Sequence, residues 1–137
     1  MKIVQETTLI DKLTKLLNPA MRFLFPELKK TSKANKEMSM NIIANILGLG
    51  NAATPLGIRA MNELQKENDD KNILSNSMIM FIVLNTASLQ LIPTTVIAIR
   101  TSLGSERPSA VIVPIWIATI VAAVTAVVVT KNLIKKF

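Results

Sequence analysis

The sequence has 137 residues, a length that suits one domain. Half of these residues are hydrophobic, and the formal net charge is +7. Such a basic charge invites a nucleic-acid interpretation, but a nucleic-acid-binding face spreads lysine and arginine over its surface and interleaves aromatic residues. Here all charged residues lie outside three uncharged runs, Met38–Ile58, Asn72–Ile99 and Ser109–Thr130. This segregation indicates an all-α integral membrane protein whose partner is the lipid bilayer and not nucleic acid.

The sequence contains no cysteine and no histidine. Disulfides, thiolate catalysis, the usual zinc sites and Ser-His triads are therefore excluded. It also has no tyrosine, and every carboxylate lies outside the uncharged runs. We expect no enzyme activity, no cofactor and no metal site. The segment Met1–Asn18 is charged throughout and is not a signal peptide.

Residues 1–37 are predicted to form an amphipathic connector and a basic linker. Lys2–Asn18 has the periodicity of an amphipathic helix, which Pro19 is expected to end because the residue before a proline is disfavoured in a helix. This helix and the short segment Ala20–Leu28 are predicted to lie at a membrane interface, with a helix of a soluble bundle as the alternative. Four lysines in Lys29–Glu37 then indicate the cytoplasmic side.

Residues 38–137 are predicted to form the membrane domain, and the first uncharged run does not fit one continuous span. Met38–Leu47 has about half the length that a bilayer requires. Gly48 and Gly50 give the backbone freedom for an unwound turn. The run is therefore predicted to be a half-helix, a turn and a second half-helix.

The second half-helix is expected to begin at Pro55, where a missing N–H is tolerated, with Asn51 or Thr54 as its cap, and to end near Glu67. The glycines also match a relaxed dinucleotide-binding fingerprint. That motif requires a preceding strand and alternating strand–helix units. The two earlier asparagines and the long apolar runs argue against this alternative.

The next two runs are long enough to cross a bilayer. Asn72–Ile99 is interrupted by polar residues from Asn85 to Gln90 and by Pro93. Such intramembrane polar groups usually face a bundle interior or an aqueous cavity. Ser109–Thr130 is a plain apolar run, and at about 1.5 Å per residue it covers about 33 Å as a helix.

The distribution of lysine and arginine indicates how the first run meets the membrane. If Met38–Ile58 crossed the bilayer, the two sides would carry 10 and 6 of these residues; if it entered and left by one face, they would carry 14 and 2. Basic residues collect on the cytoplasmic side. We therefore expect a multi-pass protein of the cell membrane with a re-entrant pair of half-helices, two transmembrane helices and both termini in the cytoplasm.

Two motifs, Asn41–Met61 and Leu84–Arg100, resemble the signature of the spore maturation protein A family, a branch of the nucleoside-recognition (Gate) membrane proteins. Leu24-Phe25-Pro26 is similar to the end of that family's amphipathic connector. The resemblance implies a role in endospore maturation, namely core dehydration and heat resistance, with a partner similar to spore maturation protein B. Because the family normally has further hydrophobic segments upstream of the connector, the resemblance also implies an N-terminally truncated member.

The two interrupted runs carry the candidate functional residues, because paired broken segments are a sequence pointer to a transporter site. Without charge, such a site suits a neutral polar solute or water better than a bare cation. The predicted role is a transport or channel component that acts with a family partner or as a homo-oligomer; the alternative is a structural or assembly membrane protein whose polar groups only join helices. The candidate pathway or helix-contact residues are Asn41, Asn45, Asn51, Thr54, Asn85, Thr86, Ser88, Gln90, Thr94 and Thr95, and the residues that break the helices are Gly48, Gly50, Pro55 and Pro93.

Overall fold

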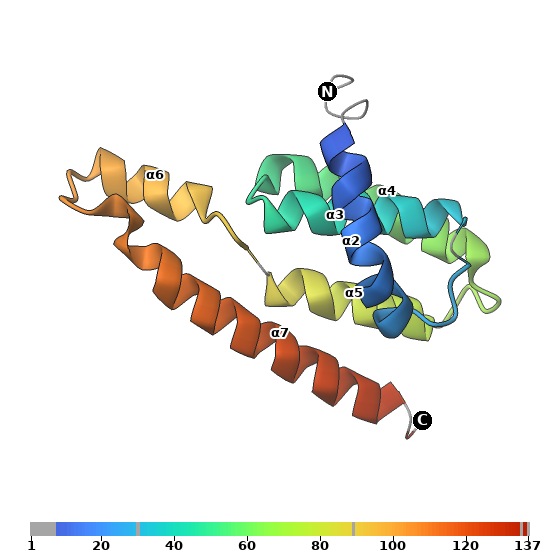
Figure 1. Cartoon of the computed structure of the whole chain (residues 1–137). Coiled ribbons are helices and arrows are strands. Elements are labelled where there is room, and N and C mark those ends of the chain that lie inside the picture. Colours follow the sequence, from blue (N-terminus) through green and yellow to red (C-terminus); the bar gives the residue numbers. More distant parts are fainter. Residues whose placement is uncertain (1–7, 30, 89, 135, 137) are drawn as a thin grey trace.

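The computed structural model describes residues 8–29, 31–88, 90–134 and 136, and this part of the chain is helical without any strand. The all-α prediction is therefore confirmed. Three helices run side by side, a fourth lies across them, and the longest helix runs along the molecule beneath them (Figure 1). The elements in chain order are α2 (Thr8–Leu24), α3 (Lys33–Ile46), α4 (Gly50–Glu67), α5 (Asn76–Ala87), α6 (Thr94–Ser102), the short 3-10 helix η1 (Pro108–Val111) and α7 (Ile112–Ile134).

Helices α3 and α4 form a helical hairpin with its turn at Gly48. Ser32 caps the start of α3, because its Oγ accepts a hydrogen bond from the Asn35 backbone N–H at 3.1 Å. Gly48 has a φ of +71°, which a residue without a Cβ adopts at little cost, and the chain reverses there. The run Met38–Ile58 thus contains a helix, a turn and a helix.

Two boundaries predicted for the N-terminal part are wrong. Helix α2 does not end before Pro19 but continues to Leu24. Pro19 is exposed while Met21 and Phe25 are buried, so packing offsets the hydrogen bond that the proline removes. Residues 33–37 are not linker but the first turn of α3, because the Ser32 cap starts the helix earlier than the charge pattern suggested.

The predicted start of α4 is also wrong. The helix begins at Gly50, so Pro55 lies inside it, and neither predicted side chain caps its N-terminus. Thr54 Oγ1 instead donates to the Gly50 carbonyl oxygen at 3.3 Å, within the helix. Pro55 is the sixth residue of α4 and has no backbone N–H, so the Asn51 carbonyl lacks the donor that a residue four positions later normally supplies. The predicted end at Glu67 is confirmed.

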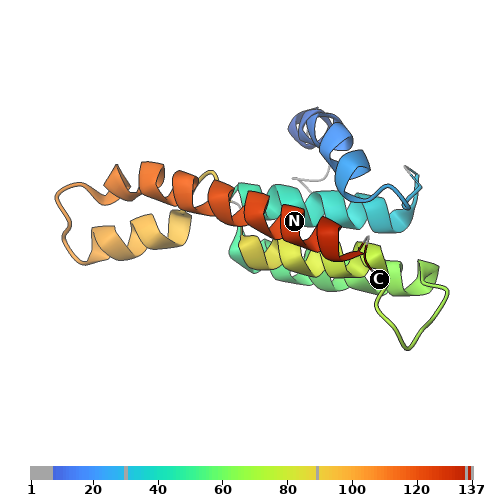
Figure 2. The same ribbon diagram turned by 90° about the horizontal axis from the view of Figure 1, so that it is seen from below.

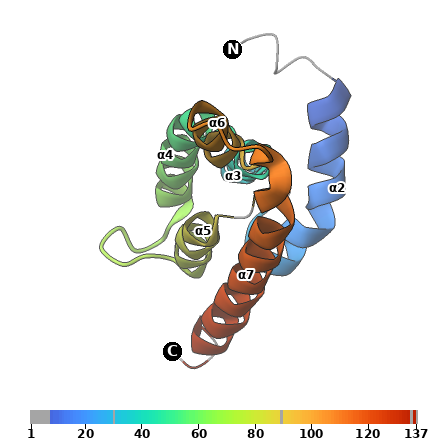
Figure 3. The same cartoon turned by 90° about the vertical axis from the view of Figure 1, so that its left-hand side faces the viewer.

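The hydrophobic core lies at the end of the bundle away from the Gly48 turn. It joins buried side chains of α2, α3, α4 and α5, namely Met21, Phe25, Ala34, Met38, Ala60, Leu64, Met78, Met80 and Phe81. Figure 3 looks along the hairpin and shows α2 lying across it, on the side away from α4. Leu16 and Phe23 of α2 are exposed, and the placement of this helix at a membrane interface stays a prediction.

Helix α7 joins this body to a projecting arm. Its second half packs against α5, whereas its first half lies outside the bundle and connects through η1 to α6 (Figure 2). At its C-terminal end Lys131 reaches α2: its Nζ donates to the Phe23 carbonyl oxygen at 2.6 Å and lies 3.2 Å from the centre of the Phe23 ring. Among the described residues, one segment, Pro108–Ile134, is a helix long and apolar enough to cross a membrane, and its most apolar stretch is not buried by the rest of the protein.

The run Asn72–Ile99 is divided between α5 and α6, and its break meets the Gly48 turn. The Leu91 N–H donates to the Ile46 carbonyl oxygen at 2.8 Å, and Thr94 Oγ1 donates to the Gly48 carbonyl oxygen at 2.8 Å. A Cβ added to Gly48 would overlap the Ile92 carbonyl oxygen. The two interruptions predicted from the sequence therefore lie against each other, backbone to backbone.

Gly48→Ala should destabilise the protein more than Gly104→Ala. Gly104 has a φ of +72°, almost equal to that of Gly48, but has open space where its Cβ would be. Both substitutions therefore incur the left-handed backbone cost, about 1–2 kcal/mol, and only Gly48→Ala adds the overlap with Ile92. Thermal unfolding of the purified variants measures the difference, and equal melting temperatures would contradict the contact.

Candidate functional site

An open groove lies between α4 and α5, with α3 as its floor. Its volume is about 610 Å³. On α4 the lining follows a single helical stripe, with small residues near the Gly48 turn and larger apolar ones further along. The lining residues are Asn41, Asn45, Gly50, Ala53, Thr54, Gly57, Ile58, Met61, Phe81, Ile82, Asn85, Thr86, Ser88 and Gln90.

Three asparagine side chains form a hydrogen-bonded chain through the groove wall, joining α3, α4 and α5. The Asn41 Nδ2 donates to the Ala53 carbonyl oxygen at 2.8 Å, and the Asn85 Nδ2 donates to the Phe81 carbonyl oxygen at 2.9 Å. These backbone acceptors fix both amides with the Oδ1 atoms turned toward Asn45. Asn45 Nδ2 then donates to Asn85 Oδ1 at 2.9 Å and to Asn41 Oδ1 at 3.3 Å.

The direction of this chain leaves Asn45 with a free acceptor. Both hydrogens of its amide are used, and no described residue donates to its Oδ1. Asn45 is half-buried and lines the groove, whereas Asn41 is fully buried beneath it. The groove wall thus presents a hydrogen-bond acceptor that its neighbours hold in one orientation.

Gly57 also lines the groove, and the sequence-based prediction did not include it. A Cβ on Gly57 would lie 3.0 Å from Asn41 Nδ2, so glycine lets α4 approach the asparagine closely. Ala53 and Gly57 are small residues four positions apart, a spacing typical of close helix contacts in membranes. That spacing could have identified both residues from the sequence.

The structure brings seven of the ten predicted site residues to the groove and places three outside it. Thr54, Thr86, Ser88 and Gln90 line it together with the three asparagines. The three residues outside the groove lining are Asn51, which is exposed, Thr94, which bonds to the Gly48 carbonyl oxygen, and Thr95, which is exposed on α6. Their assignment to a solute pathway stays a prediction.

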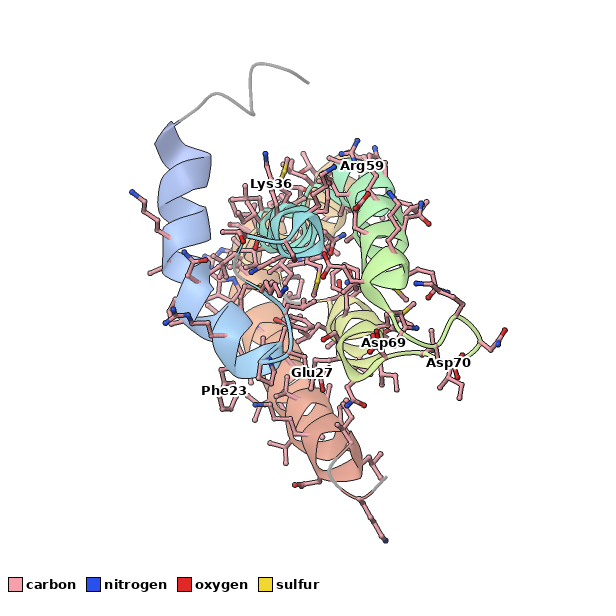
Figure 4. All side chains as sticks on the ribbon, turned by 90° about the vertical axis from the view of Figure 1, so that its right-hand side faces the viewer. Phe23, Glu27, Lys36, Arg59, Asp69 and Asp70 are labelled. Atoms are coloured by element: carbon pink, nitrogen blue, oxygen red, sulfur yellow. The ribbon has the colours of Figure 1, made fainter. Side chains whose placement is uncertain are left out.

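None of the described residues that line the groove is titratable, and charged side chains lie around the outside of the hairpin. Arg59 Nε lies 3.2 Å from Glu37 Oε2, and Lys36 and Arg59 lie on the side of the hairpin away from α7 (Figure 4). The Lys66 ammonium bonds to Glu63 at 2.6 Å and lowers the pKa of that carboxyl. In the described part of the chain, no group of histidine, cysteine or carboxylate side chains could hold a metal ion.

In its described residues the chain is thus a helical protein with one helix of membrane-spanning length and a groove lined by amides and hydroxyls beside its interrupted helices. Over 131 residues the chain is 38% identical to spore maturation protein A of Bacillus subtilis (strain 168), and the alignment covers 96% of this chain and 67% of that protein. The chain belongs to the spore maturation protein A family. No protein-family model and no solved structure matches it.

Substitution of Asn45 should lower stability in a graded manner. Asn45→Ala removes the donor shared by the Oδ1 atoms of Asn41 and Asn85, and an unpaired buried polar group costs about 1–3 kcal/mol. Asn45→Asp should lower stability further, because a carboxylate oxygen would then replace the amide donor and face the Oδ1 atoms of Asn41 and Asn85. Thermal unfolding measures both, with Asn62→Ala on the exposed surface of α4 as the control. An Asn45→Asp variant as stable as the wild type would contradict the assigned directions.

Proposed function

We propose that this chain is an integral membrane protein of endospore maturation, in which the groove forms part of a pathway for water or a small neutral polar solute. The observation that carries the proposal is the placement of the groove: amides and hydroxyls line it between helices drawn from two otherwise apolar, uncharged runs. Membership of the spore maturation protein A family supports the role in spore maturation. Core dehydration and the heat resistance that follows from it are processes in which such a pathway would act.

Helix lengths support the proposed membrane placement. Pro108–Ile134 has 27 residues and covers about 40 Å as a helix, enough to cross the bilayer. Helix α3 has 14 residues and covers about 21 Å, so the hairpin would reach only partway and return to the face it entered. Helices α5 and α6 would cross together as one broken span.

The chemistry of the lining supports a neutral solute. Its polar groups are side-chain amides and hydroxyls, which donate and accept hydrogen bonds but do not compensate a full charge. Phe81, Ile82 and Ile58 add apolar surface beside them, as in most small-molecule sites. The described residues of the groove lining include no carboxylate, lysine or arginine that could act in catalysis, and we propose that the protein is not an enzyme. The proposed partner is a second family member, such as a protein similar to spore maturation protein B, or another copy of the chain.

One observation favours a second candidate function, that of a structural or assembly membrane protein. The three asparagines of the groove wall bond to each other and to backbone carbonyls, so their polar groups already have a role in joining helices. In that case the groove would be a gap between helices and not a pathway. The two functions predict different effects when a groove residue that makes no hydrogen bond between helices is substituted. A pathway predicts loss of function, and a structural role predicts no change.

Thr86→Val should reduce function without reducing the amount of protein. The Thr86 hydroxyl lines the groove, and among the described residues it bonds only to the Ile82 carbonyl oxygen, 2.9 Å away within α5. Loss of one hydrogen bond to a solute costs about 1 kcal/mol, so flux should fall about fivefold. The measurement is the count of heat-resistant spores when this chain replaces spore maturation protein A in Bacillus subtilis, with membrane abundance followed in parallel.

Thr101→Val is the matched control, because its hydroxyl makes the same bond to the residue four positions earlier, at 2.8 Å, on α6 outside the groove. Spore heat resistance unchanged in Thr86→Val would favour the structural function. If even the wild-type chain failed to restore heat-resistant spores while present in the membrane, the proposed role would be wrong.

Single cysteines should place the α4–α5 loop on the same face as the N-terminal linker. Since the chain has no cysteine of its own, Lys29→Cys, Asp70→Cys and Glu106→Cys each report one site with a membrane-impermeant maleimide. The first two should react from the cytoplasmic face and Glu106→Cys from the opposite face. Labelling of Lys29→Cys and Asp70→Cys from opposite faces would exclude the re-entrant hairpin.

A further inference from the structure

The groove is open on one side, and no described segment covers that opening. Helix α2 lies on the other side of α3, and α7 packs against α5 from below (Figure 3). The rim is exposed: the side chains of Ile58 and Ile82 are 59% and 42% accessible, and Thr54 and Thr86 are exposed beside them. In the proposed membrane placement this opening would face lipid, where polar groups without partners are costly.

The charge distribution restricts what could cover it. With 14 lysine and arginine residues on one side and 2 on the other, all copies of the chain insert in the same orientation. Every copy then presents its groove at the same depth and on the same face. A two-fold axis along the membrane normal can therefore bring two grooves face to face.

The chemistry of the face is suited to contact with itself. A surface on a two-fold axis must be self-complementary, which like charges would prevent. None of the described residues that line the groove is charged. Thr54 and Thr86 donate their hydroxyl hydrogens within their own helices, which leaves their oxygens as acceptors. Ser88 and the Gln90 amide each keep a hydrogen that can be donated to such an acceptor. The apolar rim of Ile58 and Ile82 would pack around them, and uncharged polar side chains commonly join helices in membranes.

We propose that the groove is closed by the groove of a second copy of this chain, which makes one polar chamber between two subunits. Each subunit contributes half of the lining, so the site is incomplete in a single chain. The inference rests on the membrane placement of the proposed function and not on transport through the groove. It commits to a second copy as the partner, where the proposed function allows another family member.

Cross-linking in membranes tests the proposal, since the chain has no cysteine. Ile58→Cys and Ile82→Cys place a thiol on the rim; Val121→Cys places one on α7 with 59% exposure, equal to that of Ile58. Native membranes that contain each variant are treated with a short bis-maleimide and examined on a denaturing gel. The rim variants should give a covalent dimer of twice 15.0 kDa, and Val121→Cys should stay monomeric.

Two outcomes would overturn the proposal. The first is a dimer yield from the rim variants no higher than that of Val121→Cys, with all three proteins equally abundant in the membrane. The second is linkage of the rim cysteines to a protein of another mass, which would show that a different partner covers the groove. The experiments test the proposed dimer and the proposed pathway separately. If the rim cysteines give a dimer but Thr86→Val leaves the count of heat-resistant spores unchanged, the interface is retained and the pathway is rejected.

Discussion

The approach of the Gly48 turn to the backbone at Ile92 is the constraint on which the rest of the structure depends. Each interrupted helix leaves N–H and C=O groups without partners at its ends. Here the end of α3 and the segment before α6 supply partners to each other, through Leu91 to Ile46 and Thr94 to Gly48. In an apolar environment, irregular backbone is tolerated only where such partners exist. Each break therefore makes the other possible, and only glycine fits between them.

The hydrogen-bonded chain of asparagine side chains also holds α5 against the hairpin of α3 and α4. Packing of apolar residues is non-directional and would allow α5 several positions beside the hairpin. The bonds from Asn41 to Ala53 and from Asn85 to Phe81 fix two amides against two different backbones, and Asn45 fits only between their oxygens. The position of α5 is thus specified by hydrogen-bond direction as well as by packing.

The interruptions and the apolar helix could be predicted from the sequence because glycine, proline and long uncharged runs act locally. Boundaries that depend on packing could not: Pro19 lies within α2 because Met21 and Phe25 are buried next to it, and nothing local to Pro19 indicates those contacts. For the site, the asparagines and hydroxyls were recognisable as polar residues in apolar runs. The spacing of Ala53 and Gly57 indicates a close helix contact, but only the fold shows that the space left by Gly57 is taken by Asn41, sixteen residues earlier in the chain.

The described residues that line the groove are all without a titratable group, which would matter for the energetics of a pathway there. Pumps and coupled transporters relay protons along aspartate, glutamate or histidine side chains, which change protonation state as they work. Amides and hydroxyls keep theirs, so a pathway lined by them would not couple its solute to the proton gradient. Such a pathway would let the solute run only down its own gradient, and the membrane potential would be left intact while it did so.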